Sequence, residues 1–349
     1  MTLASDDRDL AQMLLPNSRT STFWKQAFAI QGSITPHVLP NVFIVGSISW
    51  LIVLIAKYVE SNFHVKPGLP LECFEFSGAA LGLLLVLRTN SGYERWWEAR
   101  KLWGGIVNQC RNLAISANAY GPADPAWQLK LARWVAAFPH VARASLRQES
   151  LPAEVAKLIG EKNAAELAHA EHMPSAVALH IARHLKSAVD SKKLDHFCFL
   201  QIDKERALLI DHIGACERIM KTPLAMAYSI KIRRFLAVFL LTLPLALVHT
   251  LENDLLVPLV SMLVAYPLFS LDQIGVELQN PFDTRNLSHL PLDEISRNIE
   301  RNVGALAGTV DLSEALPESV EPVIEPISNK RFVSVLSDNF RFLGGAKRN

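Results

Sequence analysis

The sequence is poor in charged residues. Asp, Glu, Lys and Arg make up only 20% of its 349 residues, against about 25% in an average soluble protein. Its 35 cationic and 34 anionic side chains leave a formal net charge of +1, which removes the usual electrostatic basis for binding nucleic acid. Half of the residues are hydrophobic and the mean hydropathy is +0.18, so the chain can bury a large core and intrinsic disorder is disfavoured.

Cysteine is also scarce, with four in the chain and no CxxC motif or close pair. This spacing predicts reduced, partly buried thiols instead of a disulfide framework. The first eight residues include Asp6 and Asp7 and have no apolar stretch, so we expect no signal peptide.

Sequence signatures of enzymes are missing. The chain has no Walker loop, GxGxxG, GxSxG or HExxH motif. His180 and His184 are four residues apart, and His169, Glu171 and His172 form a second small group. Neither group supplies three or four convergent metal ligands, so we interpret these histidines as structural. We expect neither catalysis nor a metal or other cofactor.

Long apolar runs are the feature that the sequence has in abundance. Four of them predict membrane helices at 38–59, 70–88, 233–251 and 255–272. The second has an uncharged stretch too short to cross a bilayer alone, unless protein or water surrounds it. Buried helices of a soluble all-α protein are the alternative, which the sharp charged edges of these runs disfavour.

Basic residues flank the runs on one side, and the short 252–254 connection is acidic. By the positive-inside tendency, four crossings leave both termini in the cytoplasm of a multi-pass protein of the cell (inner) membrane. Residues 89–230 are charged and helix-patterned, which predicts a cytosolic helical body continuous with the membrane helices. Within it, Pro139 interrupts an apolar pattern, Pro152 and Pro174 mark helix starts, and residues 195–220 form another helix. Residues 304–349 are interpreted as a loosely ordered C-terminal arm.

Three blocks of sequence carry a more specific signal than any short motif. They lie at 88–114, 214–234 and 280–300, in that order. Together they resemble the bacterial branch of the bestrophin family of ion channels, over residues 22–303. The matching residues are Asn90, Tyr93, Arg95, Trp103 and Gly104, then Cys216, Glu217, Arg218, Thr222, Pro223 and Tyr228, then Asn280, Pro281, Phe282 and Asp283.

The resemblance implies a homopentamer of all-α membrane subunits, each with four transmembrane helices and a cytosolic helical body. The second membrane helix of each subunit would line a central pore that continues through the cytosolic body. The family's apolar neck falls at Ala79, Leu83 and Leu87, and its cytosolic aperture at Phe197. The family usually has a bulkier residue at the position of Ala79, so Leu83 and Leu87 would form most of the constriction.

The residues themselves are compatible with that assignment. Ala79, Leu83 and Leu87 recur every four residues and share a helix face. Gly78 and Gly82 form an adjacent small-residue face, where neighbouring helices can approach closely. From the residues alone, ordinary helix packing would be the preferred interpretation; the resemblance favours a hydrophobic neck, which can gate by dewetting.

The third block also bears on regulation by calcium. Calcium needs six or more oxygen ligands, and Arg285 occupies a place where further carboxylates would be required. We therefore expect no calcium clasp, and interpret Asp283 as a helix cap or a partner of Arg285.

Inner-rim charges at Arg88 and Arg95 favour anions if they face the lumen, whereas pairing with Glu94 and Glu98 would cancel their field. We expect passive conduction of chloride and similar anions, with further copies of the chain, the lipid bilayer and permeant inorganic ions as partners, and no nucleic acid. A monovalent cation channel of the same fold and a non-conducting membrane scaffold are the alternatives.

Overall fold

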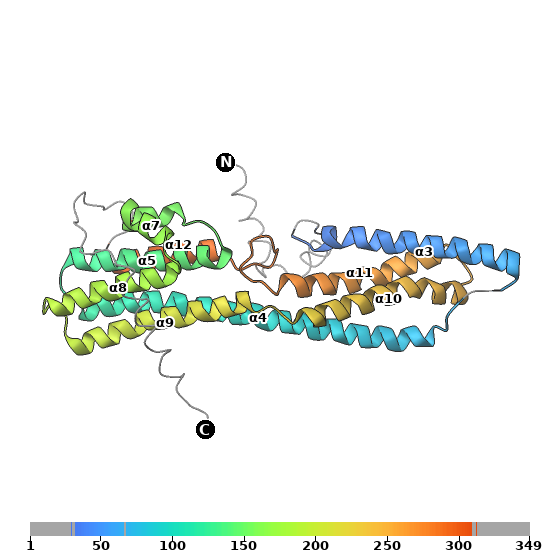
Figure 1. Ribbon diagram of the computed structural model, residues 1–349, viewed down its shortest axis with the longest axis horizontal. Helices are drawn as coiled ribbons and strands as arrows, with labels where there is room; N and C mark the ends of the chain where they lie inside the picture. Colours follow the sequence, from blue (N-terminus) through green and yellow to red (C-terminus); the bar gives the residue numbers. More distant parts are fainter. Residues whose placement is uncertain (1–28, 30–31, 66–67, 309–311, 313–349) are drawn as a thin grey trace, which may run out of the picture. The chain divides into compact units, whose positions relative to one another are not determined.

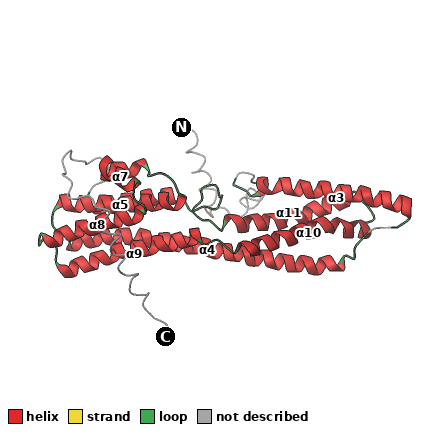
Figure 2. Cartoon of the chain, in the orientation of Figure 1, coloured by secondary structure: helices red, strands yellow, loops and turns green. Residues whose placement is uncertain are grey.

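The computed structural model of the chain describes residue 29, residues 32–65 and 68–308, and residue 312. Within these residues every regular element is a helix and no strand occurs, which confirms the all-α prediction (Figure 2). The helices are α3 Thr35–Phe63, α4 Glu72–Tyr120, α5 Pro125–Arg147, α6 Ala153–Ile159, α7 Glu161–Ala168, α8 Met173–Asp190, α9 His196–Lys221, α10 Met226–Thr250, α11 Leu256–Glu277 and α12 Leu292–Leu306.

The chain divides into two compact units, Met1–Leu312 and Ser313–Asn349. The second unit, which holds most of the predicted C-terminal arm, lies outside the described residues. Everything below concerns the first unit.

Helix α4 connects two groups of helices. It has 49 residues, a length of about 74 Å at 1.5 Å per residue. Its first half packs with α10 and α11, which in turn pack with α3, and its second half packs with α5, α9 and α12 (Figure 1). Each group has its own buried core. We call them the membrane group and the body; α4 runs through both.

In the described part of the chain, three helices are long and apolar enough to cross a membrane, namely α3, α10 and α11. Helix α3 contains the predicted span 38–59, and α10 and α11 cover the spans 233–251 and 255–272 except for one end residue each, Leu251 and Leu255. The exposed side chains of these helices include Phe43, Leu51 and Leu263. The fourth predicted span, 70–88, lies at the start of α4 and has charged residues near both ends, Glu72 and Glu75 at one and Arg88 at the other. That this segment crosses the membrane stays a prediction.

Small residues allow close approach inside the membrane group. A Cβ atom at Gly46 of α3 would lie only 2.5 Å from the Met262 sulfur of α11. One turn further along, the hydroxyls of Ser49 and Ser261 are 3.1 Å apart and fully buried. Backbone proximity and an interhelical hydrogen bond are the usual means by which membrane helices associate.

Pro139 does not interrupt its helix, contrary to the sequence expectation. Helix α5 continues through it. A proline removes the hydrogen bond to the carbonyl four residues earlier, here that of Val135. The thiol of Cys110 on α4 lies 3.9 Å from this carbonyl oxygen and donates to it. A tertiary contact thus partly replaces the missing backbone bond.

Other helix boundaries follow the predicted signals. Pro152 is the N-cap of α6, and Pro174 lies in the first turn of α8. Asp195 caps α9 by accepting from the backbone amides of its first turn. All four cysteines are unpaired, which confirms the absence of a disulfide framework.

Candidate functional site

The predicted neck residues lie on an exposed face of α4. Ala79 is exposed, and Leu83 and Leu87 are 61% and 48% exposed. On the opposite face, Leu81 and Leu85 are fully buried in the core shared with α10. The stripe is therefore not packed within its own chain. It is free to face lipid, another subunit or a lumen.

The two glycines beside the stripe have different surroundings. A Cβ atom at Gly78 would lie 3.3 Å from the ring of Phe239 on α10, so this glycine belongs to packing within the chain. A Cβ atom at Gly82 would meet nothing within 4 Å. Of the pair, only Gly82 leaves room for a helix from outside the chain.

Arg88 does not line an open rim. It is 1% exposed and forms an ion pair with Asp272 of α11, which also accepts from Arg233 Nε of α10 at 3.1 Å. Gly275 faces the methylene groups of Arg88, where a Cβ atom would lie in ordinary contact at 3.5 Å. Neither sequence alternative, exposure to a lumen or pairing with Glu94 or Glu98, describes this arrangement. Asp272 neutralises the charge of Arg88 inside the helix group.

Arg95 acts as a structural clamp instead of a rim charge. Its Nη1 donates to the carbonyl of Thr222 at 2.7 Å, and its Nη2 to that of Ile219 at 2.5 Å. Both carbonyls lie at the C-terminal end of α9, where helix carbonyls lack backbone partners and favour a cation. Burial lowers the pKa of Arg95 from its ordinary value, while Glu98 opposes this effect. Arg95 thus caps α9 from α4.

The Cys216–Arg218 block holds α9 against its neighbours. Cys216 is fully buried, and burial raises the pKa of its thiol to about 12. Arg218 pairs with Glu98 of α4 at 2.8 Å. Glu217 is 2.5 Å from His172 Nε2 and 3.2 Å from Lys221 Nζ.

His172 links the start of α8 to α9. Its Nδ1 accepts from the backbone amide of Ser175, so it is the N-cap of α8, and its Nε2 donates to Glu217. Although desolvation acts in the opposite direction, the bonds from His172 and Lys221 hold the pKa of Glu217 below its ordinary value. This pair could not be predicted from a local sequence pattern, because its members are 45 residues apart.

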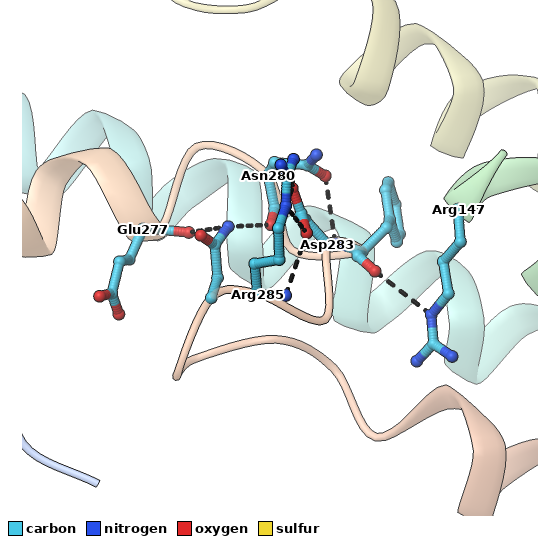
Figure 3. A network of polar contacts seen from close by, with 7 residues as sticks. Arg147, Glu277, Asn280, Asp283 and Arg285 are labelled. Carbon is cyan, nitrogen blue, oxygen red and sulfur yellow. Dashed lines mark hydrogen bonds and ion pairs between the residues drawn. The ribbon is translucent and has the colours of Figure 1, made fainter. Parts of the chain in front are cut away.

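The Asn280–Asp283 segment forms a polar loop between α11 and α12 (Figure 3). The Asn286 side chain donates to the carbonyls of Glu277 and Asn280 at 3.2 and 2.9 Å. The Asn280 side chain accepts from the amide of Phe282, whose carbonyl accepts from Arg147 of α5. The loop therefore fixes the end of α11 against the body.

Asp283 is the partner of Arg285, which confirms that part of the prediction. The guanidinium of Arg285 binds both carboxylate oxygens, with Nη2 2.6 Å from Oδ2 (Figure 3). These bonds lower the pKa of Asp283. Asp283 is not a helix cap, since α12 begins at Leu292.

The other paired histidines stack on tryptophans. His180 and His184 of α8 face Trp134 and Trp127 of α5, with ring centroids 4.2 and 5.0 Å apart. The His184 ring is 3.0 Å from the carbonyl of Trp127 and donates to it. Burial lowers the pKa of both, to about 4 for His184. The described residues contain no group of three or more His, Cys, Asp or Glu side chains placed to hold a metal.

Phe197 is 83% exposed in the first turn of α9, at the end of the body far from the membrane group (Figure 1). Leu200, one turn later, is 64% exposed. Two large apolar side chains therefore occupy the surface where the resemblance places an aperture.

The exposed stripe of α4 continues into the body with charged residues that the sequence analysis did not identify as site residues. Glu94 and Lys101 follow Leu87 at intervals of seven residues, two helix turns each, and both are exposed. Neither forms an ion pair within the described part of the chain. The seven-residue spacing from Leu87 is the signal that could have identified them.

Comparison with known proteins gives one consistent result. Residues 15–305 match the family model described as bacterial and fungal bestrophin protein. The chain is 30% identical to a voltage-dependent anion channel-forming protein of Synechocystis, covering 82% of this chain and 92% of that one. It is 32% identical to a protein of the same description from Nostoc, covering 81% and 91%.

Solved structures agree with this result. A bacterial bestrophin homologue from Klebsiella pneumoniae superposes with a TM-score of 0.72 at 25% sequence identity. The match covers 78% of this chain and 99% of that one.

Proposed function

The chain belongs to the bestrophin family, and from that premise we propose that it forms a homopentameric channel that conducts chloride and similar anions passively across the cell membrane. Two relatives that match most of the chain are voltage-dependent anion channel-forming proteins, which supports the anion as the conducted species. In this proposal the four helical segments 38–59, 70–88, 233–251 and 255–272 cross the membrane, and both termini are cytoplasmic.

The observation that carries the proposal is the exposed apolar stripe of α4. Leu83 and Leu87 have large exposed side chains on a segment too short and too charged at its ends to face lipid alone. Surrounding this segment with sister helices removes that difficulty. Five copies of the stripe then form a neck. Leu83 and Leu87 set its diameter, and the pore is wider at Ala79 on the outer side, because alanine has a smaller side chain.

Gly82 supports the same arrangement. It has open space within 4 Å beside the stripe, so a neighbouring α4 can approach closely there. Further along the pathway, the exposed faces of α4 and α9 line a cytosolic vestibule in this proposal, and Phe197 forms its aperture.

Charge selection in this proposal lies below the neck. An apolar constriction has no sign of its own, and the charges of Arg88 and Arg95 are bound within the chain. The exposed charged residues that continue the apolar stripe of α4 into the body are Glu94 and Lys101, which have opposite signs.

Flux and stoichiometry test the proposal together. Purified full-length protein is reconstituted into planar bilayers, and reversal potentials are measured under asymmetric NaCl and after replacing chloride by gluconate. We expect the reversal potential to follow chloride, and mass measurement in detergent to give five subunits. A potential that follows sodium would identify the cation channel, and a non-pentameric protein without flux would identify the scaffold.

A paired variant tests the neck itself. Leu83→Ala with Leu87→Ala should raise the anion flux several-fold, because a wider neck retains water more easily. Leu51→Ala with Leu54→Ala is the matched control, since both are membrane leucines of α3 with similar exposure, 55% and 49%, outside the stripe. Equal effects of the two changes would place the neck elsewhere.

A further inference from the structure

Arg88, Arg233 and Asp272 bring charge from three helices to one level of the membrane group. They belong to α4, α10 and α11, and Asp272 accepts from both arginines. In the sequence, all three close a predicted membrane span at its cytosolic end. A convergence of span ends at one cluster places it at the depth of lipid headgroups.

The cluster has one positive charge in excess, and that charge is accessible. Arg88 is 1% exposed, whereas the Arg233 side chain is 54% exposed. Arg233 uses Nε to bind Asp272 at 3.1 Å, and its two Nη groups bind no residue in the described part of the chain. A guanidinium with free Nη donors is suited to a second oxyanion, above all a phosphate.

The surface around Arg233 has the amphipathic order of a phospholipid. Lys231 and Arg234 are exposed beside it. Further into the membrane, the same helix exposes Val238 and Leu241, by 60% and 43%. Basic groups at the headgroup level, followed by apolar side chains, are complementary to a phosphate that carries acyl chains.

We propose that Arg233 binds the phosphate of an anionic phospholipid, and that Asp272 transmits this binding to α4. A phosphate on the Nη groups of Arg233 shares the positive charge of the guanidinium with Asp272, so the pairing of Asp272 with Arg233 weakens and its pairing with Arg88 strengthens. Arg88 directly follows the neck residue Leu87. The content of anionic lipid in the membrane therefore alters the diameter of the neck. This second step rests on the proposed channel function.

Binding is tested first, without any flux. Full-length protein in detergent is titrated with short-chain phosphatidylglycerol and with phosphatidylcholine, and occupancy is followed by native mass spectrometry. We expect at least tenfold tighter binding of phosphatidylglycerol. Arg233→Gln should reduce this preference to twofold or less.

Arg234→Gln is the matched control, because it removes the same charge from the next residue, which does not contact Asp272. It should retain most of the preference. Equal losses in the two variants would mean diffuse surface charge and overturn the site. Three other results would also overturn the lipid site: equal binding of the two lipids by the unmodified protein, full competition by inorganic phosphate, or cross-linking of a second copy of the chain to this face.

The transmission step is tested separately by anion flux from liposomes with and without 20% phosphatidylglycerol. We expect a flux difference of threefold or more for the unmodified protein, and none for Arg233→Gln. If lipid binding depends on Arg233 but the anion flux is the same with and without phosphatidylglycerol, the proposed coupling through Asp272 is wrong and the lipid site is retained. Lipid binding without any flux in any membrane would instead refute the channel.

Discussion

The two halves of α4 belong to one helix but are held in place by different physics. In the membrane group, α4 packs through buried leucines and one charge cluster around Asp272. In the body, charged side chains bind helix ends and partners one by one, as Arg95 does at the end of α9 and Glu98 with Arg218. Where water is excluded, an ion pair that loses one member leaves an unpaired charge. Where water is near, the same loss is mostly screened.

The largest effect should come from breaking the charge cluster. Asp272→Asn leaves Arg88 buried without an anion, which typically costs about 3–5 kcal/mol of stability. Thermal unfolding in detergent should show a large decrease in the transition temperature. Asp254→Asn is the control, because the Lys57–Asp254 pair is 59% and 29% exposed and should contribute about 1 kcal/mol or less. Similar decreases for both variants would remove the distinction between the two environments.

This cluster also marks what the sequence could not predict. The apolar runs predicted α3, α10 and α11, because a run of about 20 apolar residues is a local property. That Arg88 pairs with Asp272 depends on a contact over 184 residues. The positive-inside pattern fixed only that basic residues lie at the inner ends; it carries no information on which helix face each one occupies.

Pro139 shows the same limit within the body. Proline lowers helix propensity in any local context, so a break was the reasonable expectation. The helix continues because its middle is buried on all sides in the body, and Cys110, on another helix, donates to the freed carbonyl. The neck positions and Phe197 came from family resemblance instead; the structure adds that these residues are exposed in the single chain.

The two faces of α4 within the membrane group provide a second, smaller contrast. Leu85 is fully buried and Leu83 is 61% exposed, two residues apart. Leu85→Ala should lower the free energy of unfolding by about 3 kcal/mol, through lost burial and a cavity, whereas Leu83→Ala should change it by less than about 1 kcal/mol. Thermal unfolding measures both. A large stability loss for Leu83→Ala would mean that its side chain packs in the assembly instead of facing an open pathway.

In the body, acid should weaken the contact between α5 and α8. The pKa of His184 is lowered to about 4 in the folded protein, against about 6.5 in an unfolded chain. The unfolded state then binds more protons between these values, so this contribution to stability is present above pH 6.5 and is lost as the pH falls. At pH 5 the loss is about 2 kcal/mol.

His184→Phe is the control for that titration, since a phenyl ring can still stack on Trp127 but cannot be protonated. Its stability should be lower at pH 7.5, because the hydrogen bond to the Trp127 carbonyl is absent, and should decrease less between pH 7.5 and pH 5. Unfolding in detergent at several pH values gives both slopes. Parallel slopes for the two proteins would assign the acid sensitivity to other groups.

The smallest expected effect concerns the charges that continue the stripe into the body. Glu94 and Lys101 are exposed on the same side of α4 as Leu87, and in the proposed vestibule, which would be filled with water, each field is screened beyond about 8–10 Å. Glu94→Gln should therefore raise the permeability ratio of chloride to sodium by only about two- to threefold, and Lys101→Gln should lower it by a similar factor, as judged from reversal potentials. Arg95→Gln should leave that ratio nearly unchanged and reduce stability, because Arg95 caps α9 instead of facing the pathway. If Arg95→Gln changed selectivity more than Glu94→Gln did, the charge that selects ions would lie on the inner rim after all.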